Sequence, residues 1–255
     1  MHLRNAAVTG LMALMPLPIA CSLDEFAAEF GQPTSAVGAT AAATGAGSGG
    51  QGNSGGAGSG GWTVGGGGAN HGLVIDPNNV AIHPSFEEST EPWLQEALDG
   101  AATPLHIQLD DAPHGLYVAQ AVETKPSTEY FHVWDNRTAV PSTVAGQRYT
   151  ASVFARAADP SSKGKPARLY VREWNGSEEL CLWTTAELAI DDIEWRRFEI
   201  SAVAIHDDLE LDVTFAQNGS EEGSSYYLDL FQVVADPAET QPPPADCTAA
   251  GGTSF

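Results

Sequence analysis

Acidic side chains stand at two places in the sequence where a carboxylate could do chemistry. Glu87 and Glu88 lie in the stretch HPSFEESTEPW, and Asp229 lies between two leucines in the apolar run SYYLDLFQVV. A carboxylate in such a run is expected to be paired, exposed at an edge or bound to a metal, because burying an unpaired charge costs free energy. From the residues alone, the acids remain candidates for catalysis, for metal binding or for ordinary surface positions. Glu88 is expected to face solvent.

Catalysis is the least favoured role for these acids. A glycosidase needs two carboxylates about 5–10 Å apart, one of them with a raised pKa. In a chain with 33 Asp and Glu residues, some pair meets that spacing by chance. The part of the chain that we expect to fold has no GxSxG nucleophile motif, and its Ser, His and Asp residues are scattered. We therefore expect that the protein is not an enzyme.

The elements that must position these side chains are β-strands. Apolar residues alternate with polar ones in runs separated by Gly, Pro, Asn and Ser turns, which is typical of an antiparallel sandwich or barrel. The clearest runs span 149–157, 167–174, 195–200, 209–215 and 225–234. We predict an all-β fold with one folded domain over residues 72–236, a length that supports a core without help from metals.

Taken in order, several segments resemble the carbohydrate-binding modules of families four and nine, which have a galactose-binding-like jelly roll. The segments are HPSFEESTEPW, APHGLYVAQAV, TVAGQRYTASVFARA, ARLYVREWNG, IEWRRFEI, LDVTFAQN and SYYLDLFQVV. The resemblance covers residues 78–235 and departs from the family pattern at His83, where an Asn is usual. It implies a structural calcium held by Glu87 and Asp229, with backbone carbonyls near 114–115 completing the site. It also implies sugar binding on the concave sheet.

Polar and aromatic side chains on the outward faces of three strands are the candidate sugar-binding residues. In a strand, successive side chains point to opposite faces, so residues that alternate with core positions share the outer face. Aromatic rings can stack on the C–H faces of a pyranose, and charged groups can hydrogen-bond its hydroxyls. The alternative is that these aromatic residues pack half-buried in the sandwich. The predicted ligand-binding set is Tyr130, His132, Trp134, Arg156, Tyr170, Arg172 and Trp174.

The N-terminus has the layout of an export signal. Residues 1–20 carry one Arg before an apolar run that ends in small residues at Cys21. The sequence LPIAC resembles a bacterial lipobox, which implies a lipid anchor on Cys21; the alternative is an ordinary signal peptide followed by a chance cysteine. Residues 21–71 form a Gly-rich segment expected to be a disordered tether, and residues 237–255 are expected to be a disordered tail.

The net charge narrows the possible binding partners, and the cysteines allow one disulfide. The formal net charge of −22 disfavours nucleic acid, whose phosphates the chain would repel. If Cys21 carries lipid, Cys181 and Cys247 remain for one possible disulfide, and the sequence leaves open whether they pair.

These observations favour a monomeric lipoprotein at the outer membrane or cell surface. We expect it to bind a polysaccharide or glycan without catalysis. The alternatives are a protein–protein interaction or scaffold module of the cell envelope, since one fold hosts many functions, and a part of a glycoside hydrolase system.

Overall fold

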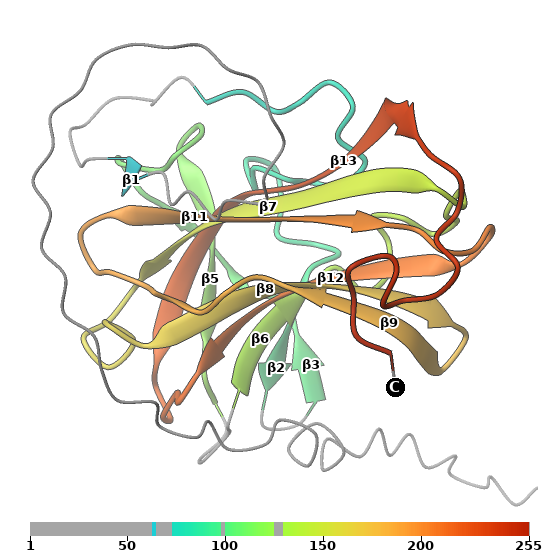
Figure 1. The fold of residues 1–255 in the computed structure, drawn as a ribbon. Coiled ribbons are helices and arrows are strands. Elements are labelled where there is room, and N and C mark those ends of the chain that lie inside the picture. The colour runs from blue at the N-terminus through green and yellow to red at the C-terminus, as the bar shows by residue number, and fades with distance from the viewer. Residues whose placement is uncertain (1–62, 65–72, 98–99, 125–129, 255) are drawn as a thin grey trace, which may run out of the picture. The chain divides into compact units, whose positions relative to one another are not determined.

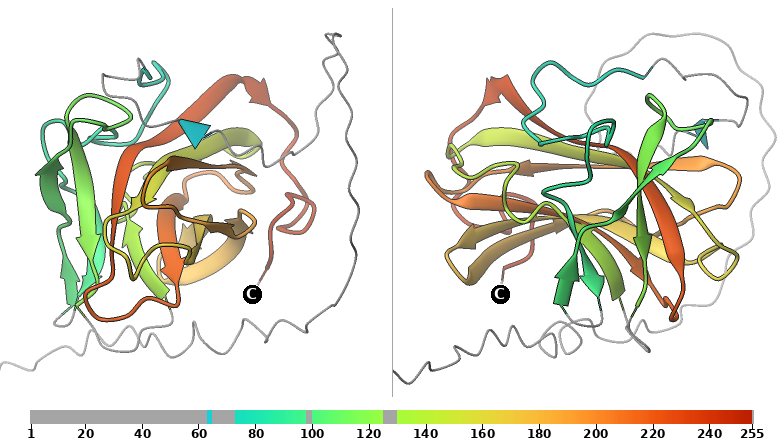
Figure 2. Two further views of the ribbon diagram at one scale, coloured as in Figure 1. Left: turned by 90° about the vertical axis from the view of Figure 1, so that its left-hand side faces the viewer. Right: turned by 180° about the vertical axis from the view of Figure 1, so that it is seen from behind.

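The computed structural model describes residues 63–64, 73–97, 100–124 and 130–254, which belong to the compact unit of residues 53–255. These residues form strands and turns, with no helix among them. Two antiparallel sheets pack face to face, which confirms the predicted all-β sandwich (Figures 1 and 2).

Sheet I contains six strands, and the last of the described strands in sequence order lies near the middle of the sheet. Its order is β1 (Thr63–Val64), β11 (Trp195–Val203), β7 (Gln147–Ala157), β13 (Ser225–Thr240), β5 (Tyr117–Val122) and β4 (Leu105–Gln108). β13 pairs with β7 on one side and with β5 on the other. The strand β1 falls within the range that the sequence assigned to a tether.

Sheet II contains seven strands. Its order is β10 (Leu188–Ala189), β8 (Pro166–Asn175), β12 (Glu210–Asn218), β6 (Tyr130–Trp134), β2 (Leu94–Ala97) and β3 (Gly100–Ala102), and β9 (Glu178–Thr184) also pairs with β8. β12 lies between β6 and β8 and pairs with both. This placement matters for the site, because β12 separates the two strands that carry most of the predicted sugar-binding residues.

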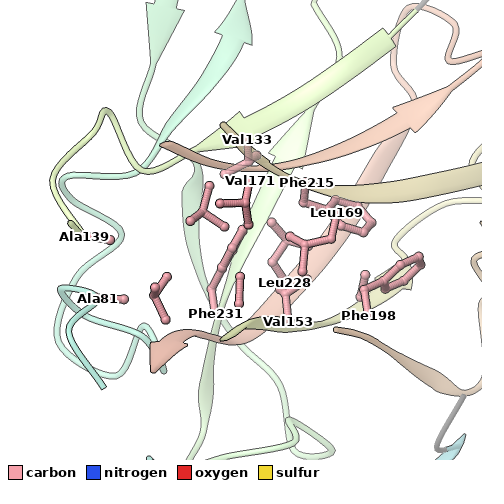
Figure 3. Packing of buried hydrophobic residues seen from close by; sticks show 14 of the residues in the cluster. Ala81, Val133, Ala139, Val153, Leu169, Val171, Phe198, Phe215, Leu228 and Phe231 are labelled. Atoms are coloured by element: carbon pink, nitrogen blue, oxygen red, sulfur yellow. The ribbon is translucent and has the colours of Figure 1, made fainter. Parts of the chain in front are cut away.

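The core lies between the inner faces of the two sheets. Leu169 on β8 and Phe215 on β12 are fully buried, as are Val153 on β7 and Leu228 on β13 (Figure 3). These residues alternate along their strands with polar or aromatic side chains that point away from the core. The alternation read from the sequence therefore assigns the inner and outer faces of these strands correctly.

The segment that follows β13 is not the disordered tail that its composition predicts. Cys247 forms a disulfide with Cys181 on β9. The C-terminal segment runs beside β9 (Figure 1). Leu182 and Thr253 exchange two backbone hydrogen bonds at the open edge of β9, and the indole N–H of Trp183 donates to the carbonyl of Ala250 at 3.0 Å. The Pro- and Gly-rich composition correctly indicates little apolar burial, but a covalent bond and edge pairing hold the segment instead.

The predicted signal segment of residues 1–20 and Cys21 lie outside the described residues, as does most of the expected tether. Within the described part of the chain, no helix is long and apolar enough to cross a membrane.

Candidate functional site

Six of the seven predicted ligand-binding residues lie on one face, the outer face of sheet II, which points away from sheet I. Their neighbours along the strands, such as Val133 on β6 and Val171 on β8, fill the core, so the alternating positions must face outward. The six residues are Tyr130, His132 and Trp134 on β6 and Tyr170, Arg172 and Trp174 on β8.

Small side chains of β12 run between these two rows of bulky ones. Thr214 lies directly opposite Trp134 on β6 and opposite Tyr170 on β8. Ala216 lies opposite His132 in the same way. The outer face therefore has aromatic side chains on both sides of a central strand whose side chains are short.

The aromatic side chains on this face differ in accessibility. Tyr170 is only 3% exposed and packs against Leu182 and Ala216, whereas Tyr130, Trp134 and Trp174 are half-buried. Burial raises the pKa of the Tyr170 hydroxyl to about 12, so this group stays neutral at physiological pH. Three of these four rings therefore keep part of their surface in solvent.

The basic side chains on this face are each matched by an acid. Arg172 donates to Asp212 at 2.7 Å and to the hydroxyl of Thr214 at 2.8 Å. The other pairs are Arg168 with Glu187 at 2.9 Å, Arg137 with Glu210 at 3.3 Å and His132 with Glu96 at 3.6 Å. The face therefore carries polar groups without a surplus of positive charge.

A buried carboxylate lies at the end of β6. Asp135 is 1% exposed and accepts backbone N–H groups from Arg137, Ala139 and Val213 at 2.9–3.1 Å. Burial, with repulsion from Asp212 as the next largest cause, raises the pKa of Asp135 to about 7, while the three N–H donors act in the opposite direction.

Trp174 is flanked by two guanidinium groups. The Cζ atom of Arg137 lies 4.2 Å from the ring centroid, and that of Arg172 lies at 5.3 Å. Cations at such distances over an aromatic face are attracted by its negative electrostatic potential. The indole N–H of Trp174 is buried and has no hydrogen-bond partner among the described residues.

Arg156 lies elsewhere, and the structure separates it from the other six residues. Arg156 is on β7 in sheet I, where it forms an ion pair with Asp111. Its Cζ atom lies 4.8 Å from the ring centroid of Trp195. Strand alternation correctly placed Arg156 on an outward face, but alternation within one strand does not reveal which sheet the strand joins. Its contacts are those of a side chain that anchors the loop of Asp111 on the outer face of sheet I.

Glu87 and Asp229 approach the same loop, residues 114–117. Glu87 Oε1 accepts the N–H groups of Leu116 and Tyr117, both at 2.8 Å, and Asp229 Oδ2 accepts the N–H of His114 at 2.7 Å. Asp229 is fully buried, and burial raises its pKa well above the usual value, with repulsion from Glu87 as a further cause.

The carboxylate of Glu87 lies directly against Gly115. A Cβ atom at Gly115 would lie 2.1 Å from the carboxyl carbon of Glu87, and the φ angle of this residue is +63°. Only glycine satisfies both conditions, because it has no Cβ and adopts positive φ freely. Carboxylate oxygens are ligands of the kind that calcium prefers, while the backbone groups that contact these two carboxylates are N–H donors. No group of three or more His, Cys, Asp or Glu side chains that could hold a metal occurs among the described residues.

Sequence reasoning missed Asp135 and Asp212. A signal for Asp212 existed, because it alternates with the core residues Leu211 and Val213 and must therefore face outward beside Arg172. No such signal existed for Asp135, which follows the last residue of β6 and whose burial depends on contacts with β12.

No protein-family model matches the chain, and no curated protein matches it. Similar solved structures include TmCBM61 in complex with β-1,4-galactotriose, at 16% identity and a TM-score of 0.41, covering 62% of this chain and 99% of that one.

Two others illustrate the range of similar structures. The CBM22-1 xylan-binding domain of Xyn10C from Paenibacillus barcinonensis has 14% identity and a TM-score of 0.43, covering 59% of this chain and 90% of that one. A cyclase from Fischerella sp. TAU has 17% identity and a TM-score of 0.46, covering 66% of this chain and all of that one. At these TM-scores the likenesses carry no argument about function, which must come from the site itself.

Proposed function

We propose that the protein binds a neutral glycan chain without catalysis, on the outer face of sheet II and along β12. The observation that carries this proposal is the arrangement of Trp134 and Tyr130 on β6 and Trp174 on β8 on either side of the short side chains of β12. A pyranose ring presents apolar C–H faces and a rim of hydroxyls, which match half-buried aromatic rings beside polar groups.

Charge favours a neutral ligand over an acidic one. The guanidinium groups on this face already have carboxylate partners, as Arg172 has Asp212, so an acidic sugar would have to compete for them. The formal net charge of −22 would also repel a polyanion. Hydroxyl groups can share such ion pairs, since each carboxylate oxygen can accept more than one hydrogen bond.

The test is binding of the full chain to an array of neutral and acidic glycans, followed by titration with a glycan that binds. Replacing Trp134 by Ala should weaken binding about tenfold, because loss of one aromatic stacking partner and its buried area costs on the order of 1.5 kcal/mol.

The matched control replaces Tyr227, a half-buried aromatic residue on sheet I, by Ala, and should leave the affinity unchanged. Equal loss in both variants would indicate general damage to the fold. A folded protein that binds no glycan would contradict the proposal and favour a protein-binding module of the cell envelope.

We further propose that calcium binds between Glu87 and Asp229 and has a structural role. The support is the close approach of two carboxylates, one of them fully buried, to the 114–117 loop. The ion would neutralise the repulsion between the carboxylates.

Anchoring through a lipid on Cys21, with the domain displayed on the outer membrane or cell surface, remains a proposal that rests on the sequence of residues 1–21. Replacing Cys21 by Ser should release the protein from the membrane fraction, and retention there would contradict the anchor.

A further inference from the structure

The turn after β6 connects three elements of the candidate glycan-binding face. The carboxylate of Asp135 accepts N–H groups of Arg137 and Ala139 in its own turn and of Val213 on β12. One buried side chain therefore ties the turn to β12, the strand along which we place the glycan.

The same turn holds Arg137 against Trp174. The guanidinium donates to the carbonyl of Gly176 at 2.5 Å, in the turn between β8 and β9, and to Glu210 at 3.3 Å. It lies over the indole ring, with its Cζ atom 4.2 Å from the ring centroid. A sugar ring that stacks on this side of Trp174 must displace Arg137.

The backbone of this turn is strained. Asn136 and Arg137 have φ angles of 53° and 58°, in the left-handed region that costs non-glycine residues on the order of 1 kcal/mol each. Such a conformation persists only where surrounding contacts impose it. The hydrogen bonds to the Asp135 carboxylate are contacts of this kind.

The charged groups around Asp135 come from three elements. Asp212 on β12 repels its negative charge, while Arg172 on β8 is bound to Asp212. In its own turn lies Arg137, which pairs with Glu210 of β12. Protonation of Asp135 thus removes a repulsion with Asp212 and at the same time weakens the bonds that close the turn.

We propose that Asp135 is a proton-controlled positioning residue whose ionised carboxylate keeps Arg137 stacked on Trp174, and whose protonation releases the turn and frees the ring for a glycan. This regulation rests on the proposed function of the face. The closed arrangement also leaves the indole N–H of Trp174 without a partner, and a ligand hydroxyl would satisfy it once the ring is uncovered.

The direction of the pH effect on the turn follows from the chemistry of the Asp135 carboxyl group. An ionised carboxylate accepts three N–H groups more strongly than a neutral carboxyl does, because charge-assisted hydrogen bonds are about twice as strong as neutral ones. Since burial raises the pKa of Asp135 to about 7, the turn closes above neutral pH and opens below it. Glycan binding is therefore expected to strengthen as the pH falls through this range.

The first experiment observes the turn without any ligand. In NMR titrations of the full chain between pH 5 and 9, the backbone amides of Arg137, Ala139 and Val213 and the indole N–H of Trp174 should shift together, with one midpoint near 7. The shared transition should vanish in Asp135→Asn, while Arg137→Ala should keep the amide transition and lose the indole one. Amides that shift only near pH 4, or not at all, would overturn the proposal.

The second experiment measures binding of an array-selected neutral glycan at pH 5.5 and pH 8.5. The wild-type protein should bind about 2–5-fold more tightly at the lower pH, the range that corresponds to one exposed cation–π contact. Arg137→Ala should bind equally tightly at both, and Arg168→Ala, a basic residue on the same face paired with Glu187, should keep the wild-type difference.

The two experiments separate the possible failures. A shared NMR transition without glycan binding at either pH would leave the proton-controlled turn in place and remove the proposed function. Glycan binding without the pH difference, or with an unchanged pH difference in Arg137→Ala, would keep the function and overturn the control by Asp135.

Discussion

At the scale of single residues, buried carboxylates are the most informative feature of this domain. Asp229 lies in sheet I and Asp135 lies in the turn after β6. Burial raises the pKa of both carboxyls, and both are held by backbone N–H groups. A carboxyl whose pKa is higher in the folded than in the unfolded chain binds its proton more tightly when folded. The resulting stability is full below the unfolded pKa and is lost as the pH rises through the folded one.

Calcium should change this pH dependence at Asp229. Because the ion binds the ionised carboxylates, it should stabilise the protein more at pH 7.5 than at pH 4.5. At a hundredfold excess over its dissociation constant it would add about 2.7 kcal/mol, which raises the melting temperature by about 5–10 °C in a domain of this size. Thermal unfolding with calcium and with a chelator checks this at both pH values.

Two variants make the calcium test specific. Glu87→Gln should abolish the effect of calcium. Glu88→Gln should retain it, because the neighbouring side chain of Glu88 is 85% exposed and points into solvent. If calcium shifts the melting temperature equally in both variants, it binds elsewhere. No shift in the wild-type protein would remove the proposed calcium site.

At the scale of elements, the C-terminal segment acts as a cover for the open edge of β9. Its disulfide joins residues 66 positions apart in the sequence. A crosslink that closes a loop of this length lowers the entropy of the unfolded chain by an amount worth about 4 kcal/mol at room temperature. The segment also supplies the acceptor for the buried indole N–H of Trp183.

Removing the disulfide should therefore destabilise the whole sandwich. We expect a Cys181→Ala, Cys247→Ala double variant to lose about 2–4 kcal/mol in the free energy of unfolding, measured by urea titration. A reductant should lower the stability of the wild-type protein by a similar amount and leave the variant unchanged. A variant as stable as the oxidised wild type would show that backbone pairing alone holds the segment.

The sequence predicts those features of a strand that depend on its own residues, such as which side chains face the core. The alternation in 149–157 and 167–174 gave the correct inner and outer faces of β7 and β8. The assignment of Arg156 to the β8 face failed because the choice of sheet depends on pairing with β11 and β13, which are distant in sequence.

The candidate site, like the strands, could be predicted only in part. The outer residues of β6 and β8 were identified, whereas the short side chains of β12 between them acquire meaning only from the strand order. The hydrogen bond from the Val213 N–H to the Asp135 carboxylate joins residues 78 positions apart, and no local sequence pattern predicts such a contact.

At the scale of the whole molecule, net charge sets which polymers can approach. With a formal charge of −22, the chain should bind a neutral glycan with an affinity that changes less than about twofold between 50 and 500 mM NaCl, because no net charge is neutralised on binding. Calorimetric titrations at several salt concentrations check this. An affinity that falls steeply with salt would show that the ligand is anionic and that a local basic surface outweighs the net charge.

The position of β13 has a consequence for how the protein is made. Residues 225–240 form an interior strand of sheet I, with β7 on one side and β5 on the other. During synthesis, those two strands leave the ribosome well before the strand that must join them. The growing chain therefore cannot complete the core of this domain until β13 has been made, and long-range pairing of this kind is slow. Until β13 is made, β5 and β7 lack the strand that joins them in sheet I.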